Sequence, residues 1–190
     1  MHAVLSPPTP GAAEGATASA LLTPLDGRPA VLLTLWPDAS AVTATAAAGG
    51  RAYEVEALLG HPSAGTDAVG VAAAASLVEF DGPRDARQVA ADRRSSEERV
   101  WPAVSQVDGT LGALHLRAAD GALAVVALAD TPATLEAALR TIMSTPLLPG
   151  EDAQLLSGPD RTFDCALEDD GVAALLARAA LSSPTPEPAR

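Results

Sequence analysis

Hydrophobic and polar positions follow two different periods along the chain, and together these periods predict a mixed α+β fold. The continuous apolar run at 30–36 (AVLLTLW) is typical of a strand that is buried on both faces. Alternation over 51–59 places Tyr53 and Val55 on one face and Glu54 and Glu56 on the other. Further strands are predicted at 71–80, 110–118, 122–130 and 161–167.

Helical spacing is clearest after Thr131, which is suited to cap a helix with Pro132 in its first turn. Three other helices are predicted, at 39–48, 83–101 and 171–181. From residue 71 to 167 the order is strand, helix, strand, hairpin, strand, helix, strand. That order predicts a ferredoxin-like βαββαβ unit, an antiparallel sheet with two helices on one face. Residues 28–60 add a strand–helix–strand element to the same core, so 28–181 are expected to form one α+β domain.

The two ends of the chain have a different composition. Residues 1–27 are rich in Pro, Ala, Gly, Ser and Thr and are predicted to be a mobile arm, and 182–190 a disordered tail. The segment 145–160 is longer than most connections, and loops of that length are often functional or lid-like.

The residue types that are missing exclude several chemistries. All 12 basic residues are arginine, so lysine Schiff bases and a P-loop lysine are excluded. A single cysteine, Cys165, allows no internal disulfide. One cysteine and three histidines are also few ligands from which to build a metal site. We therefore expect no metal and no cofactor. No stretch has the features of a signal peptide or a spanning helix, which favours a cytoplasmic setting.

The net charge of −12 bears on the partners of the protein. Nucleic acids and anionic membranes are bound through cationic surfaces, so the sequence argues against both. A small organic molecule and a second copy of the chain remain as the expected partners. The copy is expected because a single ferredoxin-like sheet leaves one apolar face uncovered. The alternative is an internal pseudo-dimer, in which the N-terminal element covers that face.

The stretch FDGPRDARQVAADRRSSEERVWPAVSQVDGTLGALHLRAADGALAVV resembles the antibiotic-biosynthesis-monooxygenase-like group of dimeric α+β barrels. The resemblance is carried by four features: the turn Asp81-Gly82-Pro83, the segment Arg99 to Val104, the step Gly109 to Leu111 and the hairpin Asp120-Gly121. It spans about 71–167. These features are turns that specify a fold, so the resemblance concerns fold more than chemistry.

The resemblance implies a dimer formed through sheet faces, with a ligand cleft between each sheet and its own helices. Its best-known oxygenating members need no metal or flavin, and use an Asn with Trp and His or Arg around the substrate. This chain contains no Asn, which departs from that pattern.

Arg93 and Glu97 are the most informative residues of the predicted helix 83–101. On a wheel of 100° per residue, both fall near the centre of an apolar stripe that includes Trp101. One interpretation is a structural ion pair, or a helix that is kinked near Ser95-Ser96. The other is the polar floor of a ligand cleft, where Arg93 holds an oxygen anion, Glu97 orients it or acts as a base, and Trp101 stacks on a ring.

His115 is a second, weaker candidate for catalysis, because its ordinary pKa lies near neutrality. If Leu114 and Leu116 face the helices, His115 and Arg117 lie on the opposite face, in a dimer seam or against the N-terminal element. The reverse arrangement would place His115 in the cleft.

Two functions remain open on the sequence alone. The first is a small-molecule-binding protein of the monooxygenase-like barrel type, an oxygenase or related enzyme for an apolar or aromatic metabolite. The second is a non-catalytic binding or assembly protein that keeps the barrel without an active site.

Overall fold

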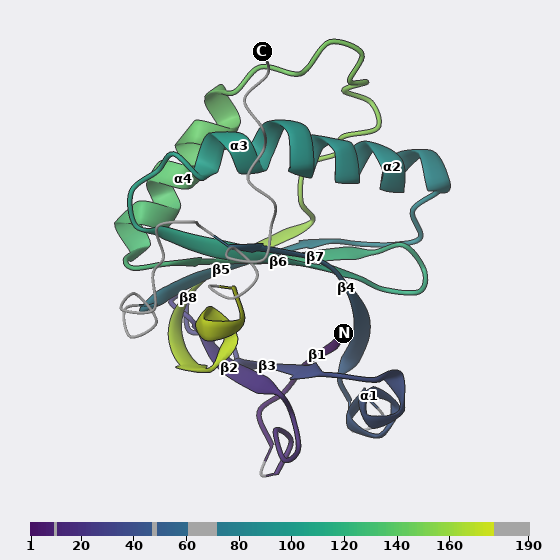
Figure 1. Ribbon diagram of the computed structural model, residues 1–190, viewed down its shortest axis with the longest axis vertical. Helices are drawn as coiled ribbons and strands as arrows, with labels where there is room; N and C mark the ends of the chain where they lie inside the picture. Colours follow the sequence, from purple (N-terminus) through teal and green to yellow (C-terminus); the bar gives the residue numbers. More distant parts are fainter. Residues whose placement is uncertain (10, 47–48, 61–71, 177–190) are drawn as a thin grey trace, which may run out of the picture.

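The strands of the computed structural model close into a single antiparallel barrel in the order β1-β3-β2-β8-β5-β7-β6-β4 (Figure 1). The structure describes residues 1–9, 11–46, 49–60 and 72–176. The first half contains β1 (His2–Ser6), β2 (Ala18–Pro24), β3 (Val31–Trp36), α1 (Ala39–Ala46) and β4 (Arg51–Gly60). The second half contains β5 (Ala74–Phe80), α2 (Ala86–Ser95), the π-helical turn η2 (Ser96–Val100), α3 (Trp101–Val104), β6 (Thr110–Arg117), β7 (Leu123–Ala129), α4 (Pro132–Ser144) and β8 (Arg161–Asp170).

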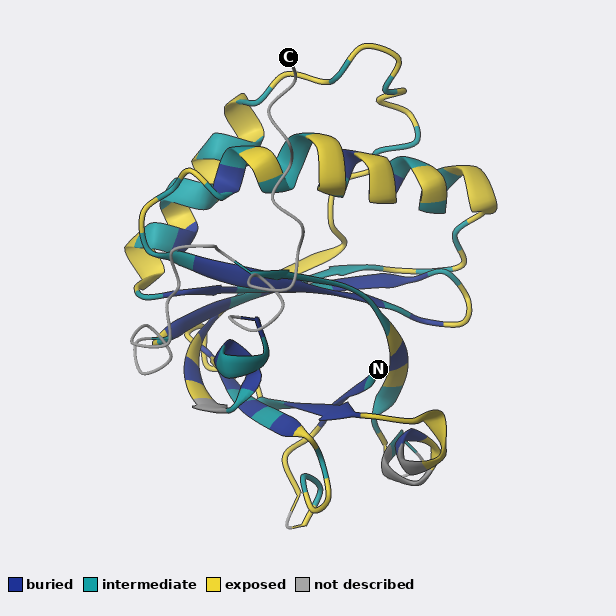
Figure 2. Cartoon of the chain, in the orientation of Figure 1, coloured by how far each residue is buried: buried dark blue, intermediate teal, exposed yellow. Residues whose placement is uncertain are grey.

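The inside of the barrel is the main hydrophobic core. Along β1, Ala3 and Leu5 belong to the interior cluster, whereas Val4 points outward and packs with Trp36 and Val42 beneath α1. The same alternation in the other strands fills the interior with apolar side chains, and Figure 2 shows the strands as the most deeply buried part of the chain. Those that are fully buried include Leu22, Leu33, Leu35, Leu114, Leu116, Val126 and Leu128.

The helices cover the outside of the barrel unevenly. α2, α3 and α4 lie over the side formed by β5, β6 and β7 (Figure 1). α1 lies at the other side, in contact with β1, β3 and β4. A short helical segment at 172–176 lies at a mouth of the barrel, where Val172 and Leu176 join the interior cluster.

The prediction of a mobile arm at 1–27 is wrong, because that segment supplies two barrel strands. β1 pairs with β3 and β4, and β2 pairs with β3 and β8. The apolar stretches of these strands are short and separated by residues rich in Pro, Gly and Ala, so their local pattern is weak. Their stability comes from pairing with strands that are distant in sequence.

The elements predicted between 28 and 167 are present in the predicted order, with bounds that differ by a few residues. The helix predicted from Pro83 begins later, since Asp85 is its N-cap. Residues 172–176 of the predicted closing helix are helical, whereas 177–181 and the predicted tail 182–190 lie outside the described residues.

The inner face of the sheet β8-β5-β7-β6 is covered within the chain by β1 to β4. This is the face for which the sequence analysis expected a second copy. Among the described residues, no helix combines the length and the apolar character needed to cross a membrane.

Candidate functional site

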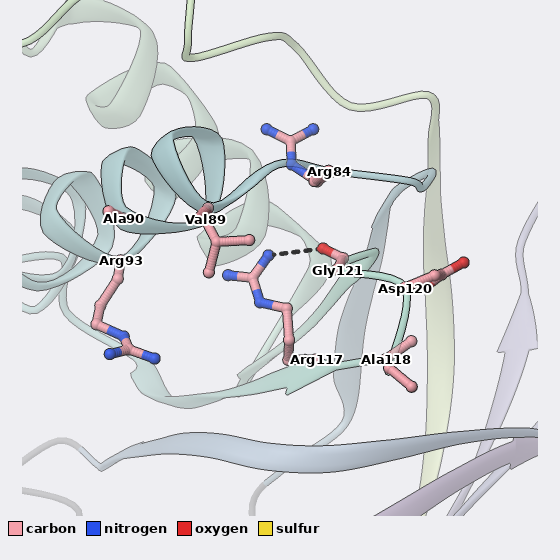
Figure 3. Close-up of a pocket in the computed structure, with 10 residues that line it drawn as sticks. Arg84, Val89, Ala90, Arg93, Arg117, Ala118, Asp120 and Gly121 are labelled. Carbon is pink, nitrogen blue, oxygen red and sulfur yellow. Dashed lines mark hydrogen bonds between the residues drawn. The ribbon is translucent and has the colours of Figure 1, made fainter.

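A solvent-open cavity of about 510 Å³ lies between α2 and the hairpin that joins β6 to β7 (Figure 3). One wall is formed by Arg84 and the first turns of α2. The other is formed by the end of β6 and the turn that follows it. The lining residues are Arg84, Ala86, Val89, Ala90, Arg93, Arg117, Ala118, Ala119, Asp120 and Gly121. We call this cavity the α2 cleft.

Local sequence fixes where α2 begins. The Asp85 carboxylate accepts hydrogen bonds from the backbone N–H groups of Arg87 and Gln88, and Gln88 Oε1 accepts one from Asp85 N–H. This capping box starts the helix at Ala86. The segment before it is attached to the hairpin, because Arg84 N–H donates to Asp120 O at 3.1 Å. Gly121, at φ +84°, permits this approach, since a Cβ there would lie 2.7 Å from Arg84 O.

Arg117 is the centre of the charged network at the base of the cleft. Its Nε and Nη2 donate to Glu56 Oε2 at 3.2 and 2.9 Å, and its Nη1 donates to Asp92 Oδ2 at 3.3 Å and Gly121 O at 3.1 Å. Each acid has a second arginine. Asp92 accepts from Arg84 Nε and Nη2 at 3.0 and 2.9 Å, and Glu56 accepts from Arg93.

The network is buried at its centre and exposed at one end. The side chains of Arg84, Asp92, Arg117 and Glu56 are 4%, 8%, 12% and 13% exposed, whereas that of Arg93 is 56% exposed. Burial by itself raises the pKa of Glu56, but the hydrogen bonds and charges of Arg93 and Arg117 outweigh it and hold the pKa below its ordinary value. Glu56 is therefore ionised at neutral pH.

A β-bulge places Glu56 in this network. The register between β4 and β6 shifts between Val55 and Ala57, and the bulged residue lies on the helix-facing side of β4. The sequence pattern correctly separates Glu56 from Tyr53 and Val55, which belong to the barrel interior. It does not reveal the partners of Glu56, because the pairing of β4 with β6 joins segments about sixty residues apart.

Of the residues predicted to line a cleft together, the structure places only Arg93 there. Glu97 is exposed and Trp101 is half-buried, and neither lines the α2 cleft as described. The reason is η2, in which Trp101 N–H donates to Ser96 O, five residues back. A π-helical turn holds more residues than an α-helical one, so a wheel of 100° per residue fails beyond Ser95. The irregularity expected as an alternative near Ser95-Ser96 is thus present, and the ion-pair partner of Arg93 is Glu56.

His115 lies on the face opposite to the one that the sequence analysis favoured. Leu114 and Leu116 belong to the barrel interior, and Arg117 reaches Asp92 on α2, so His115 faces the helices. The main apolar compartment is the inside of the barrel rather than the helix–sheet layer, which reverses the expected arrangement. Burial lowers the pKa of His115 to about 4. The negative charge of Glu56 raises this pKa, and the positive charge of Arg117 lowers it. The imidazole is neutral at pH 7, but it does not line the α2 cleft.

The loop at 145–160, noted above for its length, is attached by three arginines to α2, to η2 and to the segment that precedes α2. Arg99 Nε lies 3.0 Å from Glu151 Oε2 in a buried ion pair. Arg94 donates to Pro149 O at 3.3 Å, and Arg84 Nη1 donates to Ser157 Oγ at 3.1 Å. Arg84 thereby connects this loop to the network of the cleft. In the part of the chain that the structure covers, no three His, Cys, Asp or Glu side chains are grouped to hold a metal ion.

The chain matches no known family model and no curated protein at the level of sequence. Solved structures do share its fold, including the following two. A crystal structure of an "anthrone oxidase-like protein" aligns with a TM-score of 0.53 at 13% identity, over 88% of this chain and 92% of that one. A "putative monooxygenase" from Lactobacillus acidophilus NCFM aligns with a TM-score of 0.51 at 6% identity, also over 88% and 92%. At such identities the likeness concerns the fold alone: the chain shares the α+β barrel fold of these two structures.

Proposed function

We propose that this chain is a small-molecule-binding protein of the monooxygenase-like barrel type, and that an apolar or aromatic metabolite binds in the α2 cleft. The observation that carries the proposal is the composition of the cleft wall. Val89 and four alanines line a solvent-open cavity of about 510 Å³, in which the side chains of Arg93 and Arg117 supply polar groups. Apolar walls with a few placed polar groups are typical of small-molecule sites.

We infer that the chain consists of two related halves. The barrel order can be divided into β4-β1-β3-β2 and β8-β5-β7-β6, and each half has its fourth, first, third and second strand in that order. This order is that of a ferredoxin-like unit, so the second half fits the predicted βαββαβ element and the first half fits a reduced copy of it. One chain then supplies both halves of the barrel, as in the internal pseudo-dimer, and closing the barrel does not require a homodimer.

The two halves differ in the helix that forms a wall of the ligand cleft. α2 connects the first and second strands of the second half, whereas the described residues between β1 and β2 form no helix. A cleft between a sheet and this helix therefore exists in one half, and we propose one ligand per chain.

An oxygenase or related enzyme is the catalytic form of this proposal, and a non-catalytic binding protein is the second candidate. The second is favoured by one specific observation: neither His115 nor Glu97, the two predicted acid–base residues, lines the α2 cleft. Ligand binding in the cleft is common to both candidates, so it is the property to test first.

Filling the cleft tests this proposal. Val89→Trp places a large side chain in the cavity, and we expect it to weaken the binding of neutral naphthalene-sized aromatics such as 1-naphthol by about tenfold or more. Isothermal titration calorimetry measures the change. Leu139→Trp is the matched control, because Leu139 is exposed on α4, away from the cleft. Equal affinity in wild type and Val89→Trp, or no binding of any such aromatic to the wild type, would refute ligand binding in the cleft.

A further inference from the structure

The three arginines of the α2 cleft line its cavity, but the two carboxylates that pair with them do not. Arg84, Arg93 and Arg117 are lining residues, whereas Glu56 and Asp92 lie outside the lining and accept hydrogen bonds from the arginines. The lining also contains Asp120, but its carboxylate is bound by Arg51 Nη2 at 2.9 and 2.8 Å. The guanidinium of Arg84 is buried against Asp92 and Ser157 and points away from the cavity (Figure 3). The positive groups that face the cavity are therefore those of Arg93 and Arg117, although the chain as a whole carries a net charge of −12.

Arg93 has hydrogen-bond donors to spare. A guanidinium carries five N–H donors. In Arg93, Nε and Nη2 each donate a hydrogen bond, and both bonds go to the same oxygen, Glu56 Oε1. Its Nη1 makes no hydrogen bond within the described part of the chain, and its side chain is more than half exposed in the cleft.

The network also holds one positive charge that its own acids do not balance. Arg84, Arg93 and Arg117 contribute three charges, and the hydrogen-bonded acids Glu56 and Asp92 contribute two of opposite sign. Glu97 acts on Arg93 through its charge and is not hydrogen-bonded to it, so it leaves the donors of Arg93 available. Glu56 keeps Arg117 as a partner when Arg93 turns toward another group. A second anion can thus be bound by Arg93 without leaving a buried carboxylate unpaired.

We propose that the metabolite bound in the α2 cleft is an organic acid with a single negative charge, whose carboxylate is held by Arg93 while its apolar part lies against Val89 and the alanines. This inference rests on the proposed function and adds the charge of the ligand. A planar guanidinium suits a carboxylate because two parallel N–H groups match its two oxygens. A single charge matches the one positive charge left over in the network.

The test compares two probes of the same shape, 1-naphthoate and its neutral amide 1-naphthamide, by isothermal titration calorimetry. For the wild type we expect naphthoate to bind about 10- to 100-fold more tightly than naphthamide, which is the range for hydrogen bonds to a charged group. Raising the ionic strength should reduce this preference. Arg93→Gln should abolish it, because the affinity for naphthoate falls much more than the affinity for naphthamide. Arg140→Gln, which removes an exposed arginine on α4, should retain it.

The outcomes separate this proposal from the function on which it rests. Equal affinities of the two probes in the wild type, or the same preference in Arg93→Gln, would overturn the carboxylate site and leave a neutral ligand cleft in place. Binding of neither probe would contradict the carboxylate site and the proposed function together. Because Arg93 is exposed and Glu56 keeps Arg117, the variant should fold, with a melting temperature close to that of the wild type.

Discussion

Replacing Arg117 with alanine should lower the free energy of unfolding by about 3–5 kcal/mol. Arg117 is the arginine that Glu56 and Asp92 share, and all three side chains are largely buried. Its removal takes a positive charge from between two carboxylates that cannot easily be hydrated, and each keeps only its other arginine. For a chain of this size, such a loss corresponds to a decrease in melting temperature of roughly 6–20 °C.

Replacing Arg93 with alanine should have a much smaller effect on the free energy of unfolding than replacing Arg117. Arg93 is mostly exposed and its partner keeps Arg117, so the expected loss is about 0–1 kcal/mol. Urea denaturation monitored by far-ultraviolet circular dichroism measures both variants, with Arg140→Ala as the exposed control. Similar losses for Arg93→Ala and Arg117→Ala would show that the network is not organised around Arg117.

His115 should make the protein less stable as the pH falls from neutrality. Its pKa is lowered to about 4 in the folded state from an ordinary 6.5, so the unfolded chain binds the proton more tightly. The stability that depends on the neutral imidazole is complete above about pH 6.5 and is lost between about pH 6.5 and 4. Between roughly pH 7.5 and 5 the expected decrease is about 2 kcal/mol.

Urea denaturation at a series of pH values measures this decrease, and His115→Leu should remove most of it. The pH range matters because Glu56, which faces His115 together with Arg117, has a lowered pKa of its own. The stabilising effect of an ionised Glu56 is lost only as the pH falls below about 4.5, so the interval above pH 5 reports on His115. A slope in His115→Leu as steep as in the wild type would contradict a buried neutral imidazole.

Arg93 shows how far the sequence pattern leads to the site. Its position on an apolar stripe is compatible with an ion pair or with a residue of a helix–sheet cleft, and in the structure Arg93 is paired with Glu56 and also lines the α2 cleft. The wheel then fails at Glu97 and Trp101, because η2 changes the helical period after Ser95. No residue type in SEERV marks a π-helical turn, so a regular period is the natural assumption there.

The partners of Arg93 depend on contacts between distant segments. Glu56 reaches Arg93 through a bulge in β4, and Arg117, which shares Glu56 with Arg93, is brought there by the pairing of β6 with β4. The face occupied by His115 was predicted wrongly for a related reason. Alternation identifies two faces of a strand, but only closure of the barrel decides which face is the inner one. That closure needs β1 and β2, whose weak local pattern indicated a mobile arm.

The central claim is that the α2 cleft is a ligand site, and the arginine side chains can report on it directly. In a titration with 1-naphthoate followed by NMR of the arginine Nε–Hε groups, the signals of Arg93 and Arg117 should shift progressively and saturate together. The signals of Arg28 and Arg140, which form exposed pairs elsewhere, should not move. Shifts that spare Arg93 and Arg117, or that appear equally in Arg28 and Arg140, would contradict the account.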